Sequence, residues 1–328
     1  MIDLMLLTTV LITSFCLTFF VLPAIIHKAV KFGISGHDMN KPDNPEVAEM
    51  GGMAIVIGVF GSLLLVIALH TFFGYTLSQN EIMVAMLTLA IIMLIGTFDD
   101  LFDMRKDVKT ILPMFAALPI IAIAAAGSTM ISFPFIGNID FGIFYILILI
   151  PLGVTVASNL TNMLAGFNGM EAGMGAVMFG AVAIIAIIRG EMEAALIAVA
   201  MLGALLAFLR FNWWPARIFM GDIGTLAIGG ALAVAVIIGN FEAVGAVLVI
   251  PYLVDFVIKA ANKFPSKEWW GELGENGKLY PLGGKVRGFC QLVMKMSNGI
   301  SEKKLVFLFI FFEVLCALLA IFLYGVIA

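Results

Sequence analysis

The chain has 328 residues, of which 62% are hydrophobic and 12% are charged, and its mean hydropathy is +1.12. Soluble domains carry roughly 25% charged residues, so this composition excludes a soluble protein and indicates a polytopic membrane protein. The net charge of −4 is too small to predict a partner, and no nucleic-acid partner is expected. The three cysteines have no paired or metal-type spacing, so they indicate neither a disulfide framework nor a zinc site.

Ten apolar stretches recur along the chain, each of about 17 to 24 residues and therefore long enough to cross the hydrocarbon layer as a helix. Because a backbone inside hydrocarbon must satisfy its own hydrogen bonds, they predict an all-α membrane protein, with residues 1–328 forming one domain. The first stretch lacks a basic leader and a small-residue cleavage site, so we expect a span rather than a cleaved signal. The predicted spans are 3–26, 51–70, 82–98, 110–127, 141–157, 172–188, 191–208, 222–239, 243–262 and 304–326.

Basic residues concentrate on one side of these spans. With ten spans the two termini share one face, and five loops share the other. Of the 18 lysines and arginines, all but Arg189 lie on or beside those five loops. The positive-inside rule therefore predicts extracytoplasmic termini and a cytoplasmic active site in a multi-pass protein of the plasma membrane. The predicted cytoplasmic loops are 27–50, 99–109, 158–171, 209–221 and 263–303.

The first polar cluster, "DDLFDMRKD", comes directly after the third predicted span. If the helix continues through it, Asp99, Asp100 and Asp103 lie within about one turn, where like charges repel one another. This arrangement favours a bound cation or a basic substrate, or it raises the pKa of one carboxyl group. A solvated helix end that is neutralised by Arg105 and two lysines is the alternative interpretation.

Two further clusters lie on the same membrane face. The sequence "SNLTNMLAGFNGMEAG" places Asn159, Asn162 and Asn168 near a glycine-rich turn, where amide oxygens can bind a hard metal ion or recognise a base. In "FNWWPARIFMGDIGTLAIGG", Asp222 begins the eighth predicted span. A helix cap explains part of the asparagine cluster, and a favourable helix dipole explains Asp222 alone. Together the three clusters predict a shared metal and phosphate site.

In this order the motifs resemble the polyprenyl-phosphate N-acetylhexosamine-1-phosphate transferases of glycosyltransferase family 4, which are ten-span membrane enzymes. "GHDMNKP" with "MGGMAI" is similar to the family's first loop and second span, and "DDLFD" followed by Lys109 is similar to its acidic motif. "NWWPARIFMGD" matches the pattern N-x-x-P-A-x-x-F-M-G-D. Because "NLTNMLAGFNGMEAG" resembles the archaeal and eukaryotic asparagine motif, the resemblance is closest to UDP-GlcNAc–dolichyl-phosphate GlcNAc-1-phosphate transferases.

The resemblance implies an enzyme that transfers a sugar-1-phosphate, with UDP-GlcNAc as the expected donor, to a polyprenyl or dolichyl-type phosphate in the membrane lipid. The reaction releases UMP and is the first membrane step of lipid-linked glycan assembly, here of an archaeal type that serves protein glycosylation. The expected cofactor is Mg²⁺, for which Mn²⁺ can substitute, because a divalent ion neutralises the donor diphosphate. The assembly expected for the protein is a homodimer.

The resemblance also implies roles for individual side chains. Asp222 and Asn162 are expected to bind the metal, and Lys109 is expected to hold the lipid phosphate. Asp99 and Asp100 occupy the family's catalytic positions, with Asp99 as the base or orienting group. The other expected contacts, to the nucleotide or sugar, come from Asp38, Met39, Asn159, Asn168, Asn212, Phe219, Lys267 and Arg287.

Two further acids are expected to support the site. Asp103, together with Asp100, is expected to keep Lys109 in place. Asp255 lies one helical turn before Lys259, and the simplest interpretation of this spacing is an ion pair, with guidance of the lipid phosphate as the alternative.

The last cytoplasmic loop, residues 263–303, departs from the family pattern although it is expected to complete the donor site. None of the chain's three histidines lies in it, whereas the bacterial enzymes carry a His-rich motif there. It also lacks the paired arginines of the eukaryotic enzyme, so Lys267 and Arg287 are the expected substitutes. The missing histidines argue against a muramyl-pentapeptide donor.

The sequence disfavours two other protein classes. A divalent-cation transporter would need acids near the midplane of several spans, but the acids crowd at one membrane face. A lipid phosphotransferase of the CDP-alcohol type would need a Gly-Ala-Arg continuation after the first aspartates, which "DLFDMRKD" lacks.

Overall fold

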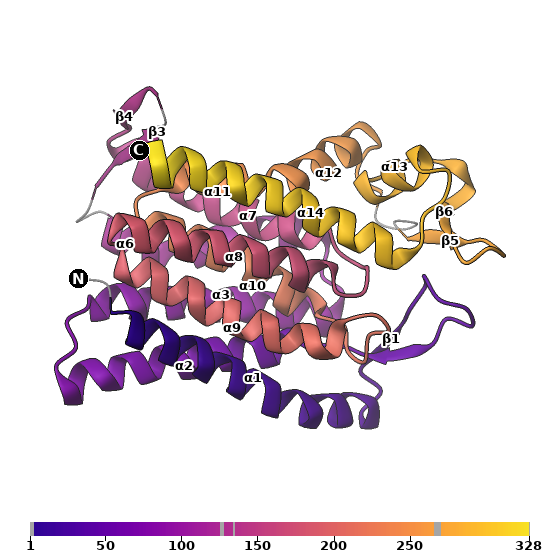
Figure 1. Cartoon of the computed structure of the whole chain (residues 1–328), viewed down its shortest axis with the longest axis horizontal. Coiled ribbons are helices and arrows are strands. Elements are labelled where there is room, and N and C mark those ends of the chain that lie inside the picture. Colours follow the sequence, from indigo (N-terminus) through magenta and orange to yellow (C-terminus); the bar gives the residue numbers. More distant parts are fainter. Residues whose placement is uncertain (1–2, 125–127, 134, 266–269, 328) are drawn as a thin grey trace.

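The computed structural model describes residues 3–124, 128–133, 135–265 and 270–327. Most of it is a helical bundle with polar hairpins at one end (Figure 1). In the described part of the chain, eight helices are long and apolar enough to cross a membrane. They are α1 (Leu4–Lys31), α2 (Gly52–Phe73), α3 (Gln79–Phe102), α7 (Ile150–Met163, with a π-helical turn over Tyr145–Leu149 before it), α8 (Met170–Arg189), α9 (Met192–Asn212), α10 (Gly221–Ile238) and α14 (Glu302–Ile321, followed by π-helical Phe322–Ile327).

The fourth predicted span, 110–127, is not one continuous helix. Pro113 is the first residue of one short helix, and Pro119 is the second residue of the next. A proline lacks the backbone N–H that would continue the helix before it. The prediction of a single span is therefore wrong here, and its last residues, 125–127, lie outside the described residues. The short helices are α4 (Lys106–Ile111), α5 (Pro113–Ala116) and α6 (Leu118–Ala124).

The ninth predicted span is bent by 61° between α11 (Glu242–Leu248) and α12 (Ile250–Ala261). Both chain termini lie at the same end of the bundle, so the chain passes through it an even number of times (Figure 1). The eight long helices and the bent pair give up to nine passes by length and composition, and the short helices α5 and α6 lie where the other span was predicted. The all-α polytopic fold is thus confirmed, with two interrupted spans.

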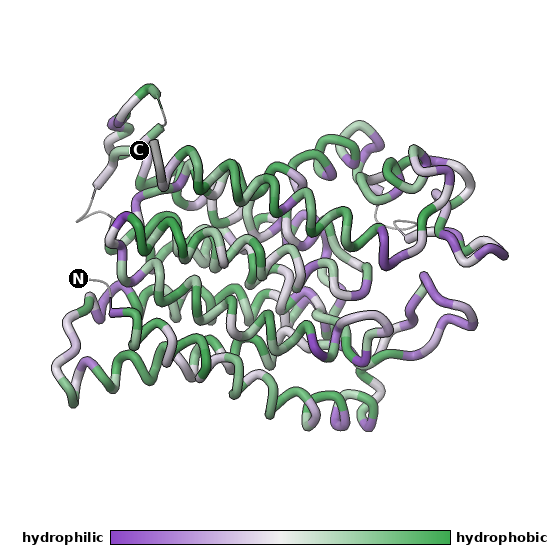
Figure 2. Tube along the Cα trace, in the orientation of Figure 1, coloured by the Kyte–Doolittle hydropathy of each residue, from purple (hydrophilic) through white to green (hydrophobic). Residues whose placement is uncertain are grey.

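Three short antiparallel hairpins and a short helix, α13 (Phe289–Met296), were not predicted. Two of the hairpins lie at the end opposite the termini, where the hydrophilic residues also gather (Figures 1 and 2). The third hairpin lies at the end with the termini (Figure 1). The pairs are β1 (Ser35–His37) with β2 (Glu46–Ala48), β3 (Met130–Phe133) with β4 (Gly137–Asp140), and β5 (Gly271–Leu273) with β6 (Leu279–Pro281).

Small residues let α2 and α3 approach the central helix α10 closely. A Cβ atom at Gly52 would lie 2.2 Å from the backbone nitrogen of Gly224, and one at Gly96 would lie 2.6 Å from the Cα atom of Ile223. Helix α10 also packs against α7 and α9. This packing fixes the first turn of α10, which contains Asp222, against the end of α3.

The substitution Gly96→Ala is expected to lower the free energy of unfolding by about 1–3 kcal/mol, because the added methyl group would overlap backbone atoms that cannot rotate away. Gly180→Ala in α8 is the matched control, since no atom lies within 4 Å of a Cβ added there. The control is expected to be neutral or stabilising by up to about 1 kcal/mol. Thermal unfolding of the purified protein in detergent measures both, and equal destabilisation would contradict the close packing.

Candidate active site

The end of α3, helix α4 and the first turn of α10 meet at Lys109. Its Nζ atom lies 2.7 Å from Asp99 Oδ2 and 3.3 Å from Asp222 Oδ2. The Asp99 side chain is only 2% exposed, whereas those of Lys109 and Asp222 are 28% and 27% exposed. The structure therefore brings together three predicted site residues in a cluster that is partly open to an incoming molecule.

Two opposing effects act on the charge of Lys109. Partial burial by itself lowers the pKa of Lys109, but the negative charges of Asp222 and Asp99 outweigh it and raise the pKa above its ordinary value. The ammonium group is consequently charged at neutral pH. It supplies a fixed positive charge between the two carboxylates.

The chain reversal after α3 determines where Lys109 lies. Asp103 ends α3 in a left-handed conformation with φ of 47°, and its backbone N–H donates to the carbonyl of Asp99. The Asp99 carboxylate also accepts the N–H of Met104 at 3.0 Å. Helix α4 then returns Lys109 over the end of α3. The Asp103 side chain itself is exposed, so its observed contribution is to the helix end rather than to Lys109.

Asp100 contacts the N-terminus of α10. Its carboxylate accepts the backbone N–H of Asp222 at 2.7 Å and that of Ile223 at 3.3 Å, so it caps α10 from another helix. Gly221 has φ of 70°, and a Cβ there would lie 2.5 Å from Asp100 Oδ2, so the position requires glycine. This geometry gives Asp100 a positioning role toward Asp222, while its predicted catalytic role stays a prediction.

Helix α7 supplies an amide oxygen beside the same turn. Asn162 Oδ1 accepts a hydrogen bond from Thr225 Oγ1 at 3.0 Å, and Thr161 Oγ1 donates to the Thr225 carbonyl at 2.7 Å. Asn159 donates to the carbonyl of Thr110 at 3.0 Å and thereby ties α7 to α4. The described residues contain no group of three or more His, Cys, Asp or Glu side chains placed to hold a metal. Asp222 and Asn162 contribute one carboxylate and one amide oxygen beside this turn of α10.

A second polar cluster surrounds Asn168. Its Nδ2 donates to Asp38 Oδ2 at 3.0 Å, and its Oδ1 accepts the N–H of Ala216 at 2.9 Å. Asn212 Oδ1 accepts the N–H of Gly169 at 3.0 Å. Because Asn168 is buried and its amide is bonded at both ends, it positions the first loop rather than presenting a free edge to a base.

Lys41 and Glu302 complete this cluster and were not predicted. Lys41 Nζ lies 3.0 Å from Asp38 Oδ2 and is also bonded to Glu302, with the two side chains only 8% and 5% exposed. Glu302 Oε1 accepts the N–H of Asn168 at 3.0 Å. Lys41 belongs to the "GHDMNKP" motif, which was a usable signal. No sequence signal pointed to Glu302, because it lies 261 residues after Lys41.

The first loop also pairs with the segment before Asp222. The backbone N–H of Phe219 donates to the carbonyl of Ala48 at 2.7 Å, and its carbonyl accepts the N–H of Gly51 at 2.9 Å. Two of the predicted motifs are therefore joined by main-chain hydrogen bonds. Met39, on the same loop, is exposed.

The remaining predicted residues lie elsewhere. Asp255 forms the expected ion pair with Lys259 at 2.7 Å, and it also accepts the N–H of Phe289 at 2.7 Å. Arg287 Nη1 donates to the carbonyl of Leu282 at 3.1 Å, within the last cytoplasmic loop. Lys267 lies outside the described residues.

The last loop also contacts the first through the side chain of Asn40. The N–H of Gly271 donates to Asn40 Oδ1 at 3.1 Å, and Asn40 Nδ2 donates to the carbonyl of Gly166 at 3.2 Å. Asn40 therefore joins the last loop to both the first loop and the asparagine motif.

Comparison with known proteins identifies the family. The sequence profile of glycosyl transferase family 4 matches residues 82–240. A Saccharolobus solfataricus protein, named provisionally as a UDP-N-acetylglucosamine–dolichyl-phosphate N-acetylglucosaminephosphotransferase, is 36% identical over 95% of both chains. A Dictyostelium discoideum protein of that name is 25% identical over 92% of this chain and 84% of its own. A Shouchella clausii phospho-N-acetylmuramoyl-pentapeptide-transferase is 35% identical over 79% and 84%, respectively. The chain belongs to glycosyl transferase family 4.

Family membership confirms the resemblance that the motifs indicated. It favours a membrane-embedded transferase over the divalent-cation transporter and over the CDP-alcohol type of phosphotransferase.

Asp100→Asn is expected to lower the free energy of unfolding by about 1–2 kcal/mol, because an amide NH₂ would face a backbone N–H of α10. Asp103→Asn is the matched control. It alters an exposed side chain, and asparagine tolerates the left-handed backbone conformation at this position. The free energy of unfolding is therefore expected to change by less than about 0.5 kcal/mol. Thermal unfolding in detergent compares the two. A stable Asp100→Asn protein would show that the cap is not needed.

The buried pair Lys41–Glu302 is expected to be energetically coupled. A double-mutant cycle with Lys41→Met and Glu302→Gln, read by thermal unfolding, should give a coupling energy of about 1–3 kcal/mol. The exposed pair Arg105–Asp107, whose atoms lie 2.8 Å apart, is the control and should give less than about 0.5 kcal/mol. Additive effects at Lys41 and Glu302 would contradict the coupling.

Proposed function

We propose that the protein transfers GlcNAc-1-phosphate from UDP-GlcNAc to a dolichyl-type polyprenyl phosphate and releases UMP. The relatives' names supply the donor and acceptor classes. The observation that carries the proposal is the position of Lys109, charged and partly exposed between Asp99 and Asp222 at the end of α3 and the start of α10. By the positive-inside rule this end faces the cytoplasm, in the plasma membrane.

Lys109 is proposed to hold the acceptor phosphate. A phosphate oxygen of the lipid attacks the β-phosphorus of the donor, a new P–O bond forms, and the bond to UMP breaks with its electron pair leaving on UMP. Asp99, which contacts Lys109 at 2.7 Å, orients the ammonium group and can accept a proton from a protonated lipid phosphate. Asp100 keeps the first turn of α10 in place while this occurs.

Asp222 and Asn162 are the residues that would hold Mg²⁺. One carboxylate and one amide oxygen suit an ion that takes its remaining ligands from substrate phosphates and water, and Mn²⁺ accepts the same oxygen donors. The ion would neutralise the diphosphate of the donor. The 27% exposure of Asp222 leaves room on its outer side for these ligands.

The nucleotide is proposed to bind between the first loop and the asparagine motif. Two hydrogen bonds hold this region together. Asn168 donates to Asp38, and Asn212 accepts the backbone N–H of Gly169. Met39 is exposed on the same loop and is available to cover the base. The last cytoplasmic loop, which bonds Asn40 through Gly271, is proposed to complete the donor site.

The proposal is tested by UMP release from the purified protein with a short polyprenyl phosphate and Mg²⁺. UDP-GlcNAc is compared with UDP-GalNAc and with UDP-MurNAc-pentapeptide, which is the donor class suggested by the Shouchella relative. Release that requires both lipid and metal and is fastest with UDP-GlcNAc is the expected result. Preference for the muramyl donor would overturn the substrate assignment. If none of the UDP-sugars gave UMP release, the proposed reaction would be wrong.

Lys109→Met is expected to lower kcat/KM by at least about 10²-fold, because it removes the cation proposed to hold the attacking acceptor phosphate. Asp222→Ala should have a similar effect and should weaken the apparent affinity for Mg²⁺. Lys106→Met, an exposed lysine one turn earlier on α4, is the matched control and should remain within about twofold of the parent. Equal losses from the two lysine variants would show that general positive charge, not the position of Lys109, matters.

Chelation supplies an independent check on the metal. EDTA is expected to abolish UMP release, and added Mg²⁺ or Mn²⁺ should restore it. Full activity in excess chelator would contradict the assignment of Asp222 and Asn162 as metal ligands.

A further inference from the structure

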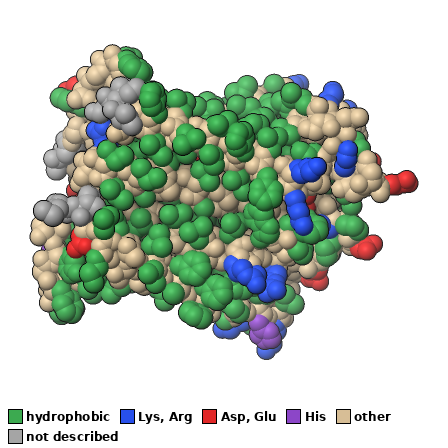
Figure 3. Space-filling model, in the orientation of Figure 1, with side chains coloured by type: hydrophobic (Ala, Val, Ile, Leu, Met, Phe, Trp, Pro, Cys, Tyr) green, Lys and Arg blue, Asp and Glu red, His purple; other side chains and the backbone are tan. Residues whose placement is uncertain are grey.

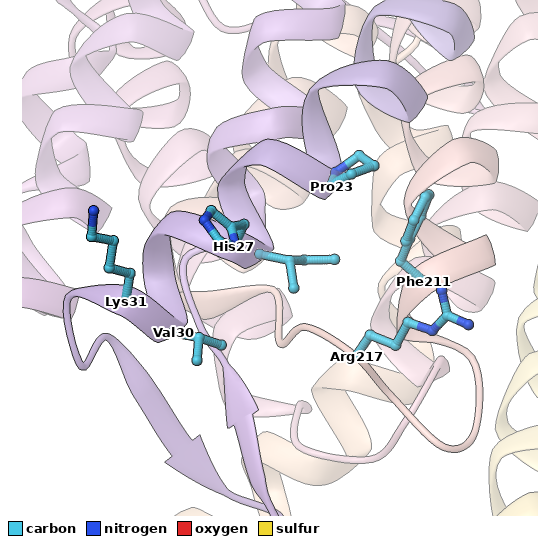
Figure 4. A pocket seen from close by; sticks show the side chains of 7 residues that line it. Pro23, His27, Val30, Lys31, Phe211 and Arg217 are labelled. Atoms are coloured by element: carbon cyan, nitrogen blue, oxygen red, sulfur yellow. The ribbon is translucent and has the colours of Figure 1, made fainter.

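Two apolar cavities lie along α1 and α9, away from the catalytic cluster. One has a volume of about 560 Å³ and is lined by Pro23, Ile26, His27, Val30, Lys31, Phe211 and Arg217 (Figure 4). The other has a volume of about 610 Å³ and is lined by Phe15, Phe19, Leu206, Leu209, Arg210 and Trp213. The catalytic side chains come instead from α3, α4, α7 and α10.

One row of side chains on α1 runs along both cavities. Phe15 and Phe19 line the second cavity, and Pro23, His27 and Lys31 line the first, each four residues after the last. Residues at this spacing share one face of a helix, so the row changes from aromatic to basic toward the cytoplasmic end of α1.

An aromatic contact joins the two cavities. The rings of Phe19 and Phe211 lie 5.4 Å apart between their centroids, and these residues line the second and the first cavity, respectively. In Figure 4, Pro23, His27 and Val30 of α1 form one wall of the first cavity, and Phe211 with Arg217 forms the other. The result is a continuous apolar surface that ends between basic groups.

The charges at this end are of one sign. No acidic side chain lines either cavity, and none of the ion pairs found in the described part of the chain involves Arg210, Arg217 or Lys31. Basic and histidine side chains also gather at the lower right of the space-filling view (Figure 3). An arginine that has no protein carboxylate is suited to a phosphate, because its guanidinium can donate two parallel hydrogen bonds.

We propose that these cavities bind an anionic phospholipid of the cytoplasmic leaflet, with its headgroup phosphate between Arg217 and His27 and a chain along Phe15 and Phe19. Basic pockets between membrane helices on the cytoplasmic side select anionic headgroups, while the apolar part accepts any chain. Lys31 lies at the outer edge, and its ammonium group points away from Arg217 in Figure 4, so it contributes a long-range attraction. The site is separate from Lys109, where the acceptor lipid phosphate is proposed to bind.

The bound lipid would affect the active site through a short stretch of chain. Arg217 is followed by Ile218 and Phe219, which pair with the first loop, and then by the turn that contains Asp222. A headgroup held by Arg217 would fix the start of this segment. Occupancy of the site is therefore expected to raise the rate of the enzyme as well as its stability.

The test measures binding of phosphatidylglycerol, with phosphatidylcholine as the neutral comparison, to the purified protein in detergent by native mass spectrometry. Arg217→Gln and His27→Gln are the site variants, and Arg217→Gln is expected to weaken phosphatidylglycerol about fivefold. Lys28→Gln is the matched control. It removes a charge at the same membrane depth on α1, but Lys28 does not line the cavity and lies about 100° around the helix from His27.

The site is supported if Arg217→Gln weakens phosphatidylglycerol while Lys28→Gln and Lys109→Met do not. Equal weakening by Lys28→Gln would overturn it, because a diffuse basic surface would then explain the binding. Equal binding of phosphatidylcholine would also overturn it, since the headgroup would not be recognised. If Arg217→Gln converts a dimeric parent protein to a monomer and leaves the amount of bound lipid unchanged, a second copy of the chain covers the cavities. That result would also overturn the lipid site. Thermal unfolding of each variant identifies loss of folding, and His27→Gln then decides the outcome.

Discussion

The first turn of α10 is held by a carboxylate that belongs to another helix. Asp100 satisfies two backbone N–H groups that α10 cannot satisfy within itself, and Gly221 leaves the space that the carboxylate occupies. The close approach at Gly96 brings α3 near enough for this contact. Because the cap sets the position of Asp222, it also sets where the carboxylate meets Lys109. The rest of the site is built around this turn.

Buried charge organises the region around the first loop in a different way. Lys41 lies among Asp38, Glu302 and the indole ring of Trp214, and its side chain is almost inaccessible to solvent. Removing Lys41 would leave the carboxylates of Asp38 and Glu302 without their shared cation in a region of low dielectric, which is costly. The pair therefore couples the first loop to the last membrane helix. The cluster around Lys109 is thus partly open, whereas the cluster around Lys41 is closed.

The two sides of the bundle serve different lipids in this scheme. The acceptor phosphate is assigned to Lys109, on the side formed by α3, α4, α7 and α10. The structural phospholipid is assigned to α1 and α9, beside the segment from Arg217 to Asp222. The segment from Arg217 to Asp222 lies between these sites. Because its main-chain hydrogen bonds to Ala48 and Gly51 restrict its movement, it can transmit lipid binding at one site to the other.

The sequence by itself determined the membrane fold and the family, because hydropathy, motif order and charge are properties of short segments. It also placed Asp99, Lys109 and Asp222 in one site, and the structure brings them together. Only the tertiary structure decided that Asp100 caps α10 and that Asn168 is internally bonded. It also decided that Glu302 joins the first loop. These are contacts between segments far apart in the chain, and their geometry depends on helix packing that no local pattern records. The broken fourth span shows the same limit, since average hydropathy conceals what two prolines do to a helix.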